Sequence, residues 1–201
     1  MLEKRYSQVG SILLAAGESK RMGTPKQLLS YKGRSLIRHA VEEAVTSNCH
    51  PVIVVLGANN GRISSELVNL PVYIAFNSQW QQGMSSSIVI GIKAMMEISH
   101  NFEALIIALA DRPLVTSKVY ARLAERYEQY HLLAVASNYD NTIGVPALFA
   151  RALLPKLLKL DRQGGAKQLL NEYSDRALNL DLPEAAIDID TPTDYQRLIK
   201  L

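Results

Sequence analysis

The sequence has little cysteine, few aromatic residues and no long apolar run. Cys49 is the only cysteine among 201 residues, so an internal disulfide and a thiol-rich metal site are excluded, and we expect Cys49 to be buried as an apolar residue. Aromatic residues make up 6% of the chain and its lysines and arginines are scattered, which argues against a nucleic-acid partner. No apolar run approaches the length that spans a bilayer. These absences leave a small molecule as the expected partner, with no nucleic acid and no membrane.

What the sequence does contain is enough apolar material for one well-packed domain. Hydrophobic residues make up 48% of the chain and the net charge is +3, so we predict a single domain over residues 1–201. The apolar stretch near the start is cut short by Glu18, Lys20 and Arg21, so no signal peptide is expected and a cytoplasmic protein is the default. The small positive charge suits an anionic substrate.

Short apolar runs alternate with helical patterns along the chain. The runs predict buried strands at residues 10–15, 52–57, 72–76, 104–111 and 132–137. Helices are predicted at residues 34–47, 60–68, 85–99, 116–130, 150–159 and 163–173, and from Pro192 onward. We expect serines to cap the helix at 85–99, and Thr116 or Ser117 to cap the next one. The alternation predicts an α/β fold, a Rossmann-like three-layer α/β/α sandwich with a mainly parallel, mixed sheet.

The loop at residues 15–26, AAGESKRMGTPK, follows the first predicted strand, where ligands of such sheets bind. Gly17 and Gly23 permit backbone geometries that expose successive N–H groups to a phosphate. Arg21 and Lys26 add positive charge, the first as a fork and the second as a point charge. The loop is neither a Walker A loop nor a dinucleotide fingerprint. It is interpreted as a phosphate-binding loop; the alternative is an ordinary turn with solvated charges.

Three carboxylates are candidate metal ligands. Asp111 ends a buried strand, where a carboxylate needs a partner or a ligand, and Asp188 and Asp190 lie two apart in an extended stretch, so they share one face. Oxygen ligands from separate parts of the chain suit Mg²⁺ (or Mn²⁺). The alternatives are that Asp111 caps a turn before Pro113 and that Asp190 caps the final helix. The pattern does not choose between Asp188 and Asp190.

Six segments resemble one known family. LLAAGESKRMGTPK at 13–26 is similar to the LAAGxSxRMGxPK motif of the MobA-like nucleotidyltransferases, and within them to the molybdenum cofactor cytidylyltransferases (MocA type). The further segments, in order, are NSQWQQGMSSSIVIG at 77–91, ALADRPLV at 108–115, GVPALF at 144–149, DRQGGAKQLL at 161–170 and DIDTPTDY at 188–195. The sequence departs from the family pattern at Arg112, where a neutral residue is usual, and at Thr193, where Glu is commoner.

The resemblance implies a fold of the nucleotide-diphospho-sugar transferase type and a transfer reaction. CMP would pass from CTP to the phosphate of molybdenum cofactor, giving the cytosine dinucleotide cofactor and pyrophosphate, with Mg²⁺ bound. A phosphate monoester is largely ionised near neutral pH, so no strong general base is needed. CTP is favoured because members with LAAG, as here, are mostly cytidylyltransferases, and the methyl group of Ala16 would narrow a base pocket against a purine.

The resemblance also implies roles for individual residues. Arg21, Lys26 and Asp111 would be catalytic, and Asp111, Asp188 and Asp190 would hold the metal ion. The nucleotide would be bound by Leu14, Ala15, Ala16, Gly17, Ser19, Arg21, Gly23, Lys26, Gly83, Met84, Ser86 and Ser87. The acceptor substrate would contact Asn77, Trp80, Pro146, Gly164 and Gly165. Ser86 and Ser87 are equally interpreted as helix caps, Trp80 as a packed aromatic residue, and Gly164 with Gly165 as a plain turn.

Two other functions fit the same motifs. The acceptor would be another phosphate, such as a sugar or polyol phosphate, or the donor would be GTP. Alternatively, the protein is a non-catalytic accessory protein that binds the finished cofactor and hands it to a molybdoenzyme. Transient contact with a molybdoenzyme or its chaperone is expected in either case.

Overall fold

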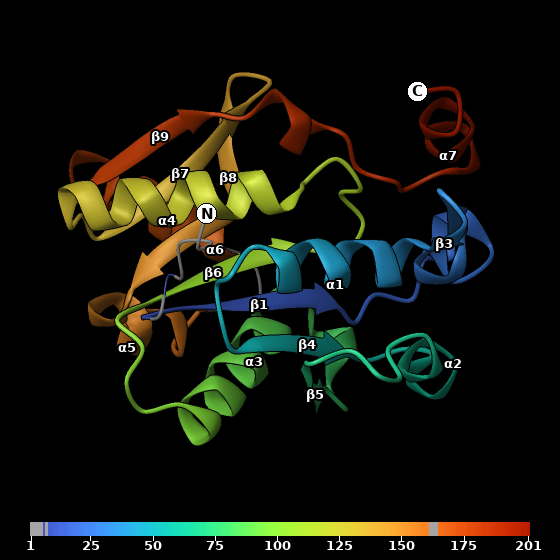
Figure 1. The fold of residues 1–201 in the computed structure, drawn as a ribbon, viewed down its shortest axis with the longest axis horizontal. Coiled ribbons are helices and arrows are strands. Elements are labelled where there is room, and N and C mark those ends of the chain that lie inside the picture. Colours follow the sequence, from blue (N-terminus) through green and yellow to red (C-terminus); the bar gives the residue numbers. More distant parts are fainter. Residues whose placement is uncertain (1–5, 7, 161–164) are drawn as a thin grey trace.

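A seven-stranded sheet forms the centre of the molecule in the computed structural model, which describes residues 6, 8–160 and 165–201 (Figure 1). In spatial order the strands are β5 (Tyr73–Phe76), β4 (Val52–Leu56), β1 (Val9–Ala15), β6 (Ala104–Leu109), β8 (Thr142–Ala150), β7 (Ala134–Tyr139) and β9 (Ala177–Asp181). The pairs are parallel except that β8 runs antiparallel to both of its neighbours. The expected mainly parallel, mixed sheet is confirmed.

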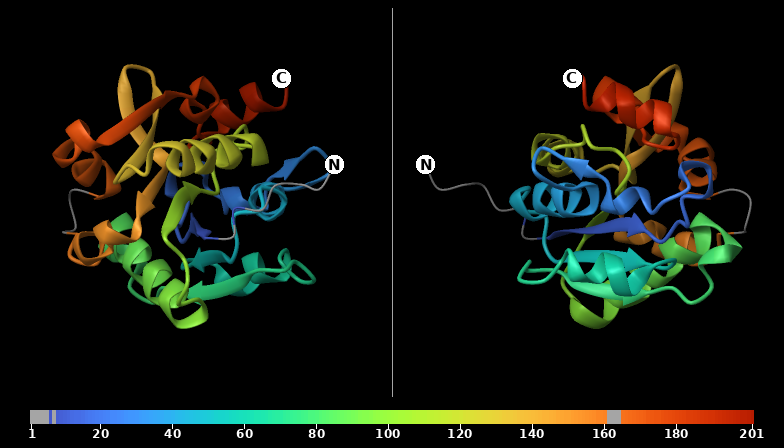
Figure 2. Two further views of the ribbon diagram at one scale, coloured as in Figure 1. Left: turned by 60° about the vertical axis from the view of Figure 1, so that its left-hand side comes forward. Right: turned by 90° about the vertical axis from the view of Figure 1, so that its right-hand side faces the viewer.

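Helices cover both faces of this sheet (Figures 1 and 2). The core on one face contains side chains of α1 (Leu36–Thr46), α2 (Asn60–Ser65) and α4 (Ser117–Tyr130). The core on the other face contains side chains of α3 (Met84–Ile98), α5 (Leu154–Leu157) and α6 (Gly165–Glu172). These two cores make the three-layer α/β/α sandwich. Within the part of the chain that the structure describes, no helix combines the length and apolarity needed to cross a bilayer.

Strand β1 shows why the central strands are apolar throughout. Leu13 and Ala15 belong to the core on the α1 side, whereas Ile12 and Leu14 belong to the core on the α3 side. Both faces of the strand are therefore removed from water, as a parallel sheet between two helical layers requires. Gly91 lets α3 pack directly on β1, since a Cβ atom added there would lie 2.6 Å from the Cγ2 atom of Ile12.

A third, smaller cluster joins residues 22–36, which follow β1, to the C-terminal residues 189–198. It combines Tyr31 of the β2–β3 hairpin (Ser30–Tyr31 and Arg34–Ser35) with Leu198 of α7 (Pro192–Leu198) and with Ile189. The hydroxyl of Tyr195 donates to the carbonyl of Ser30 at 2.8 Å. This contact brings the C-terminal segment close to the loop that follows β1.

The secondary structure differs from the sequence prediction mainly in the second half. The helix predicted at 150–159 is confirmed only as a shorter, mixed element, because β8 continues to Ala150 and is followed by a 3₁₀ turn at Arg151–Leu153 and the four-residue α5. Strands β8 and β9 were not predicted. Strand β9 lies at the edge of the sheet with alternating partial exposure, so it lacks the continuous apolar run used to find the other strands.

The predicted serine caps of α3 are also wrong. The N-cap residue is Gly83, with φ 101°, and no side chain caps this helix. Ser86 lies in the first turn, where its hydroxyl donates to the carbonyl of Gly83 at 2.8 Å. Thr116 is the N-cap residue of α4 but makes no side-chain cap bond. The N–H of Ser117 is bound by the carboxylate of Glu43 instead, at 2.8 Å.

Candidate active site

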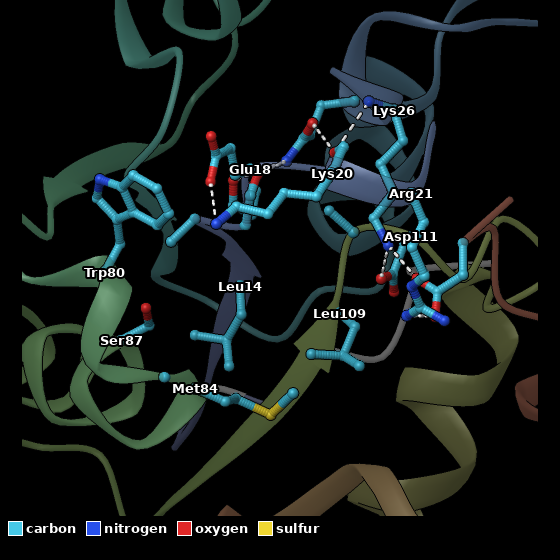
Figure 3. Close-up of a pocket in the computed structure, with 18 of the residues that line it drawn as sticks. Leu14, Glu18, Lys20, Arg21, Lys26, Trp80, Met84, Ser87, Leu109 and Asp111 are labelled. Carbon is cyan, nitrogen blue, oxygen red and sulfur yellow. Dashed lines mark hydrogen bonds and ion pairs between the residues drawn. The ribbon is translucent and has the colours of Figure 1, made fainter. Parts of the chain in front are cut away.

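A cavity of about 480 Å³ opens at the carboxyl ends of β1 and β6 (Figure 3). This is the edge at which open α/β sheets bind ligands, and the volume lies in the usual range for a small-molecule site. The sequence-predicted residues that line it are Leu14, Ala15, Ala16, Gly17, Ser19, Arg21, Lys26, Trp80, Gly83, Met84, Ser87, Asp111 and Asp190. Most of the residues assigned from the sequence to the nucleotide therefore surround one cavity.

The cavity has an apolar side and an ionic side. In Figure 3, Trp80 and Met84 lie on one side, Leu14 and Leu109 lie in the middle of the view, and the ion pair of Glu18 and Lys20 is drawn between Trp80 and Lys26. Lys26, Arg21 and Asp111 lie on the opposite side, on the loop after β1 and at the end of β6. Such a division suits an amphipathic ligand with a flat ring at one end and negative charge at the other.

The ionic side is built around Lys26. Its Nζ donates to Asp111 Oδ2 at 2.6 Å and to Asp190 Oδ1 at 2.8 Å, and Arg21 Nη2 binds Asp190 Oδ2 at 2.5 Å. Burial by itself lowers the pKa of Lys26, but the two carboxylates outweigh it and raise that pKa above its ordinary value. The hydrogen bond from Lys26 lowers the pKa of Asp190 in spite of partial burial. Lys26 and Asp190 are therefore both charged near neutral pH.

Asp111 retains an oxygen for a ligand that the protein does not provide. Its Oδ1 atom is buried and has no hydrogen-bond partner among the residues that the structure describes, although a buried carboxylate oxygen is costly unless it is satisfied. Among the described residues no three His, Cys, Asp or Glu side chains are arranged to hold a metal ion by themselves. The pair Asp111 and Asp190 nevertheless fits Mg²⁺ or Mn²⁺, since such ions are commonly held by one or two carboxylates together with substrate phosphates and water.

The structure distinguishes Asp190 from Asp188. Asp190 lines the cavity, whereas Asp188 is exposed and lies outside the lining. The pKa of Asp188 is raised above its ordinary value by partial burial and by the negative charges of Asp190 and Asp111. Asp188 therefore lies near the other two carboxylates, but Lys26 bonds to Asp111 and Asp190 and not to Asp188. Asp190 does not cap the last helix: Thr191 does, in a capping box with Asp194. The alternative interpretation of Asp190 as a helix cap is therefore wrong.

Several sequence-predicted residues lie outside the cavity lining. These are Gly23, Asn77, Ser86, Pro146, Gly165 and Asp188, and Gly164 is outside the described residues. Asn77 is buried and donates to the hydroxyls of Ser86 and Ser87 at 2.8 and 2.9 Å, so it fixes the loop before α3. Pro146 is buried within β8, where its carbonyl accepts from Ser137. Neither position supports contact with an acceptor.

Sequence reasoning missed seven residues that line the cavity. They are Glu18, Lys20, Gln27, Leu36, Gln81, Leu109 and Ala110. Leu109 and Ala110 directly precede Asp111, so their place at the end of a strand was a usable signal. Gln27 is polar yet only 4% exposed. Nothing in the local sequence around Gln27 indicates this burial.

The family profile of the MobA-like NTP transferase domain matches residues 11–177, which include the loop after β1, Asp111 and α3. The chain belongs to the MobA-like NTP transferase family. This result confirms the resemblance at the level of the family. The cytidylyl subgroup is a finer assignment that the family profile does not decide.

Two curated relatives carry different names. The chain is 38% identical to a nicotine blue oxidoreductase of Paenarthrobacter nicotinovorans over 116 residues, which is 57% of this chain and only 55% of that protein. It is 28% identical to a probable molybdenum cofactor guanylyltransferase of Carboxydothermus hydrogenoformans over 200 residues, which is 94% of both chains. The second match spans nearly the whole of both proteins, whereas the first spans about half of each.

A solved structure agrees with the fold of this family member. The Rv0371c protein of Mycobacterium tuberculosis superimposes with a TM-score of 0.84 at 22% identity, covering 98% of this chain and 100% of that one. A second structure of that protein, in complex with manganese, gives a TM-score of 0.77 at 20% identity, covering 96% of this chain and 99% of that one. A neighbour of the same fold therefore binds a divalent cation.

Arg112, the departure from the pattern of the MobA-like family, points away from the cavity lining. Its guanidinium lies 4.7 Å from the ring centroid of Tyr139, and its Nη1 atom donates to the carbonyl of Ala185. The N–H of Ile189 also donates to the carbonyl of Asp111, at 3.0 Å. Arg112 thus helps to hold the C-terminal segment, including Asp190, against the end of β6.

The buried side chain of His39 gives a prediction about the pH dependence of stability. Its Nε2 atom donates to the carbonyl of Pro113 at 2.9 Å, so its Nδ1 atom is the acceptor for Arg34 Nη2 at 3.1 Å. Burial lowers the pKa of His39 below the ordinary value of 6.5. The unfolded chain therefore binds the proton more readily. The stability that neutral His39 contributes is complete above pH 6.5 and is lost as the pH falls from 6.5 through the folded-state pKa.

We expect the free energy of unfolding to fall between pH 7 and pH 5 through this residue, because the unfolded chain takes up the proton first. Urea unfolding across that range measures it. His39→Gln should flatten the pH dependence, whereas His100→Gln, a change at an exposed position, should leave it as in the wild type. Equal curves for all three proteins would contradict the prediction.

Proposed function

We propose that this chain transfers CMP from CTP to the phosphate of molybdenum cofactor, using Mg²⁺ and releasing pyrophosphate. The observation that carries the proposal is the meeting of Lys26, Arg21, Asp111 and Asp190 on the ionic side of one cavity. Charges of both signs at this place suit a triphosphate with a divalent cation. Membership of a transferase family supports the transfer reaction, and the full-length similarity to a probable molybdenum cofactor guanylyltransferase supports the acceptor; the choice of CTP rests on the LAAG segment and on Ala16.

The reaction needs positioning more than acid–base chemistry. An acceptor phosphate oxygen forms a bond to the α-phosphorus, the bond from that phosphorus to the bridging oxygen breaks, and pyrophosphate leaves with its electron pair. The acceptor is already largely ionised, so no general base is required. Arg21 and Lys26 would stabilise the negative charge that spreads over the phosphates. A cation held by Asp111 and Asp190 would supply Lewis-acid polarisation of a phosphoryl oxygen.

The surroundings of Ala16 support a small base at the apolar side of the cavity. Its carbonyl accepts the N–H of Ala58 at 3.1 Å, which ties the end of β1 to the end of β4. A Cβ atom added to Gly57 would lie 2.7 Å from that carbonyl and 2.7 Å from the Cβ atom of Trp80. Ala16 and Trp80 therefore both pack closely against Gly57, so neither can withdraw toward β4 to admit a larger ring. CTP is therefore our choice over GTP.

A single assay design tests donor and acceptor together. Pyrophosphate release is measured with CTP, GTP, ATP and UTP, with Mg²⁺ or Mn²⁺, against molybdenum cofactor and a panel of sugar and polyol phosphates. We expect release with CTP and molybdenum cofactor only. Release with GTP, or with a sugar phosphate alone, would contradict the corresponding half of the proposal. Tight binding of the finished dinucleotide cofactor without any turnover would favour the accessory-protein alternative.

A redox reaction is the second candidate, because the partial match at 38% identity is to a protein named nicotine blue oxidoreductase. The apolar side of the cavity, with Trp80 and Met84, suits a flat organic ring. The measurement uses nicotine blue as the substrate and a reduced nicotinamide dinucleotide as the reductant, and it follows the loss of the absorbance of nicotine blue. Dye reduction without pyrophosphate release in the assay above would replace the transferase proposal.

A further inference from the structure

The side chain of Gln27 lies beneath the loop that follows β1 and is only 4% exposed. Its amide nitrogen donates to the carbonyl of Ala15 at 3.2 Å and to the carbonyl of Gly17 at 2.9 Å. Its amide oxygen accepts from the hydroxyl of Ser19 at 3.2 Å. One buried side chain thus contacts the loop at three points, from the end of the strand to the turn before Arg21.

Ser19 extends this set of contacts to Lys26. The backbone of Ser19 is left-handed, with φ 63°, a conformation that costs energy for a residue other than glycine. Its hydroxyl oxygen accepts the backbone N–H of Lys26 at 3.1 Å while the same hydroxyl donates to Gln27. The side chain therefore holds the strained backbone in place. The chain of hydrogen bonds Gln27–Ser19–Lys26 fixes the backbone from which the Lys26 side chain reaches the two carboxylates.

The contacts of Gln27 have an electrostatic consequence. A carbonyl oxygen beside a phosphate site repels the phosphate oxygens unless a donor engages it. The two donors of one neutral amide engage the carbonyls of Ala15 and Gly17 together, and both of these residues line the cavity. No other residue type of this size offers two donors and an acceptor without a charge.

We propose that Gln27 is a positioning residue for nucleotide binding: it neutralises the two loop carbonyls and, through Ser19, sets the place of Lys26. The proposal rests on the proposed function, since it assumes that the loop binds the triphosphate. It assigns to Gln27 no contact with the reacting atoms. Its effect is on the binding of phosphate groups, whatever base they carry.

Two substitutions and one control separate this role from simple packing. Gln27→Glu keeps the shape but places carboxylate oxygens against the two carbonyls. Gln27→Met keeps the volume and removes all polar contacts. Gln129→Glu adds the same charge at an exposed position on α4. Binding of CTP with Mn²⁺ and of inorganic tripolyphosphate is measured for each protein by calorimetry, together with the melting temperature and, with acceptor, kcat and KM.

We expect Gln27→Glu to weaken the binding of both CTP and tripolyphosphate by at least about tenfold, and Gln27→Met to weaken it by less. The KM for the triphosphate should rise more than kcat falls. The Gln129→Glu control should bind as the wild type does. A folded Gln27→Glu protein with wild-type affinity for tripolyphosphate would overturn the proposal.

The proposed function and the inference about Gln27 would be overturned by different results. A wild-type protein that binds neither CTP, GTP nor tripolyphosphate would overturn the proposed function and this inference together. The inference alone would be overturned if the wild-type protein binds them and each Gln27 variant loses affinity only in proportion to the fall in its melting temperature. A lower kcat with an unchanged KM for the triphosphate in the Gln27 variants would also overturn the inference, because a residue that positions the triphosphate must affect its binding.

Discussion

Replacement of Asp111 by Asn should abolish nucleotidyl transfer, with a loss of at least about a thousandfold in kcat, because metal-assisted stabilisation of the transition state amounts to several kcal/mol. The substitution keeps the shape of the side chain and removes the negative charge. It also removes one of the two carboxylates bound by Lys26. Since the buried Oδ1 atom is the ligand position that the protein leaves free, Mn²⁺ binding should be lost along with activity.

Pyrophosphate release and Mn²⁺ binding followed by electron paramagnetic resonance measure the two effects. The matched control is Asp175→Asn, because Asp175 is exposed and far from the cavity lining. It should retain activity and metal binding. An Asp111→Asn protein that remains folded and active would remove Asp111 from the metal site and would leave the proposed mechanism without its central residue.

Replacement of Lys26 by Met should have two effects of opposite direction. Transfer should slow by about a hundredfold or more, since a cation that stabilises developing charge in a partly buried site is lost. Binding of Mn²⁺ in the absence of nucleotide should become tighter. The reason is that the Lys26 ammonium contacts both Asp111 and Asp190, at 2.6 and 2.8 Å, so its positive charge opposes a metal ion bound to the same two carboxylates.

The exposed Lys118 provides the control, because Lys118→Met makes the same change on the surface of α4. Mn²⁺ titration of the three proteins without nucleotide is the decisive measurement. Weaker metal binding in Lys26→Met would show that Lys26 supports the metal site instead of competing for it, and would contradict the interpretation of the two ion pairs.

The sequence revealed those parts of the molecule whose signal is local. The apolar runs of β1, β4 and β6 are continuous because each strand is covered on both faces, so their positions were predictable. The loop with Arg21 and Lys26 follows the first of these runs directly. Strand β8 was missed because it is the antiparallel strand and no helix precedes it in the expected alternation, so the βαβ pattern offers no place for it.

The parts that stayed hidden depend on contacts between distant residues. Asp190 and Lys26 are separated by 164 positions in the chain, and long-range contacts bring them together, among them the packing of Ile189 and α7 against the β2–β3 hairpin. No spacing rule covers such a distance, so the sequence did not show which of Asp188 and Asp190 is the better candidate for a metal ligand. Gln27 was missed for a different reason: a lone Gln in a polar loop does not reveal from sequence that it is buried.

The late position of Asp190 in the chain also has a consequence during synthesis. The phosphate loop, Asp111 and the parallel core strands all precede β9, so they leave the ribosome long before the second carboxylate does. A chain that ends before residue 190 therefore lacks one of the two carboxylates proposed to hold the cation. Any metal capture that needs both carboxylates is thus postponed until translation has passed residue 190 and the C-terminal segment has docked.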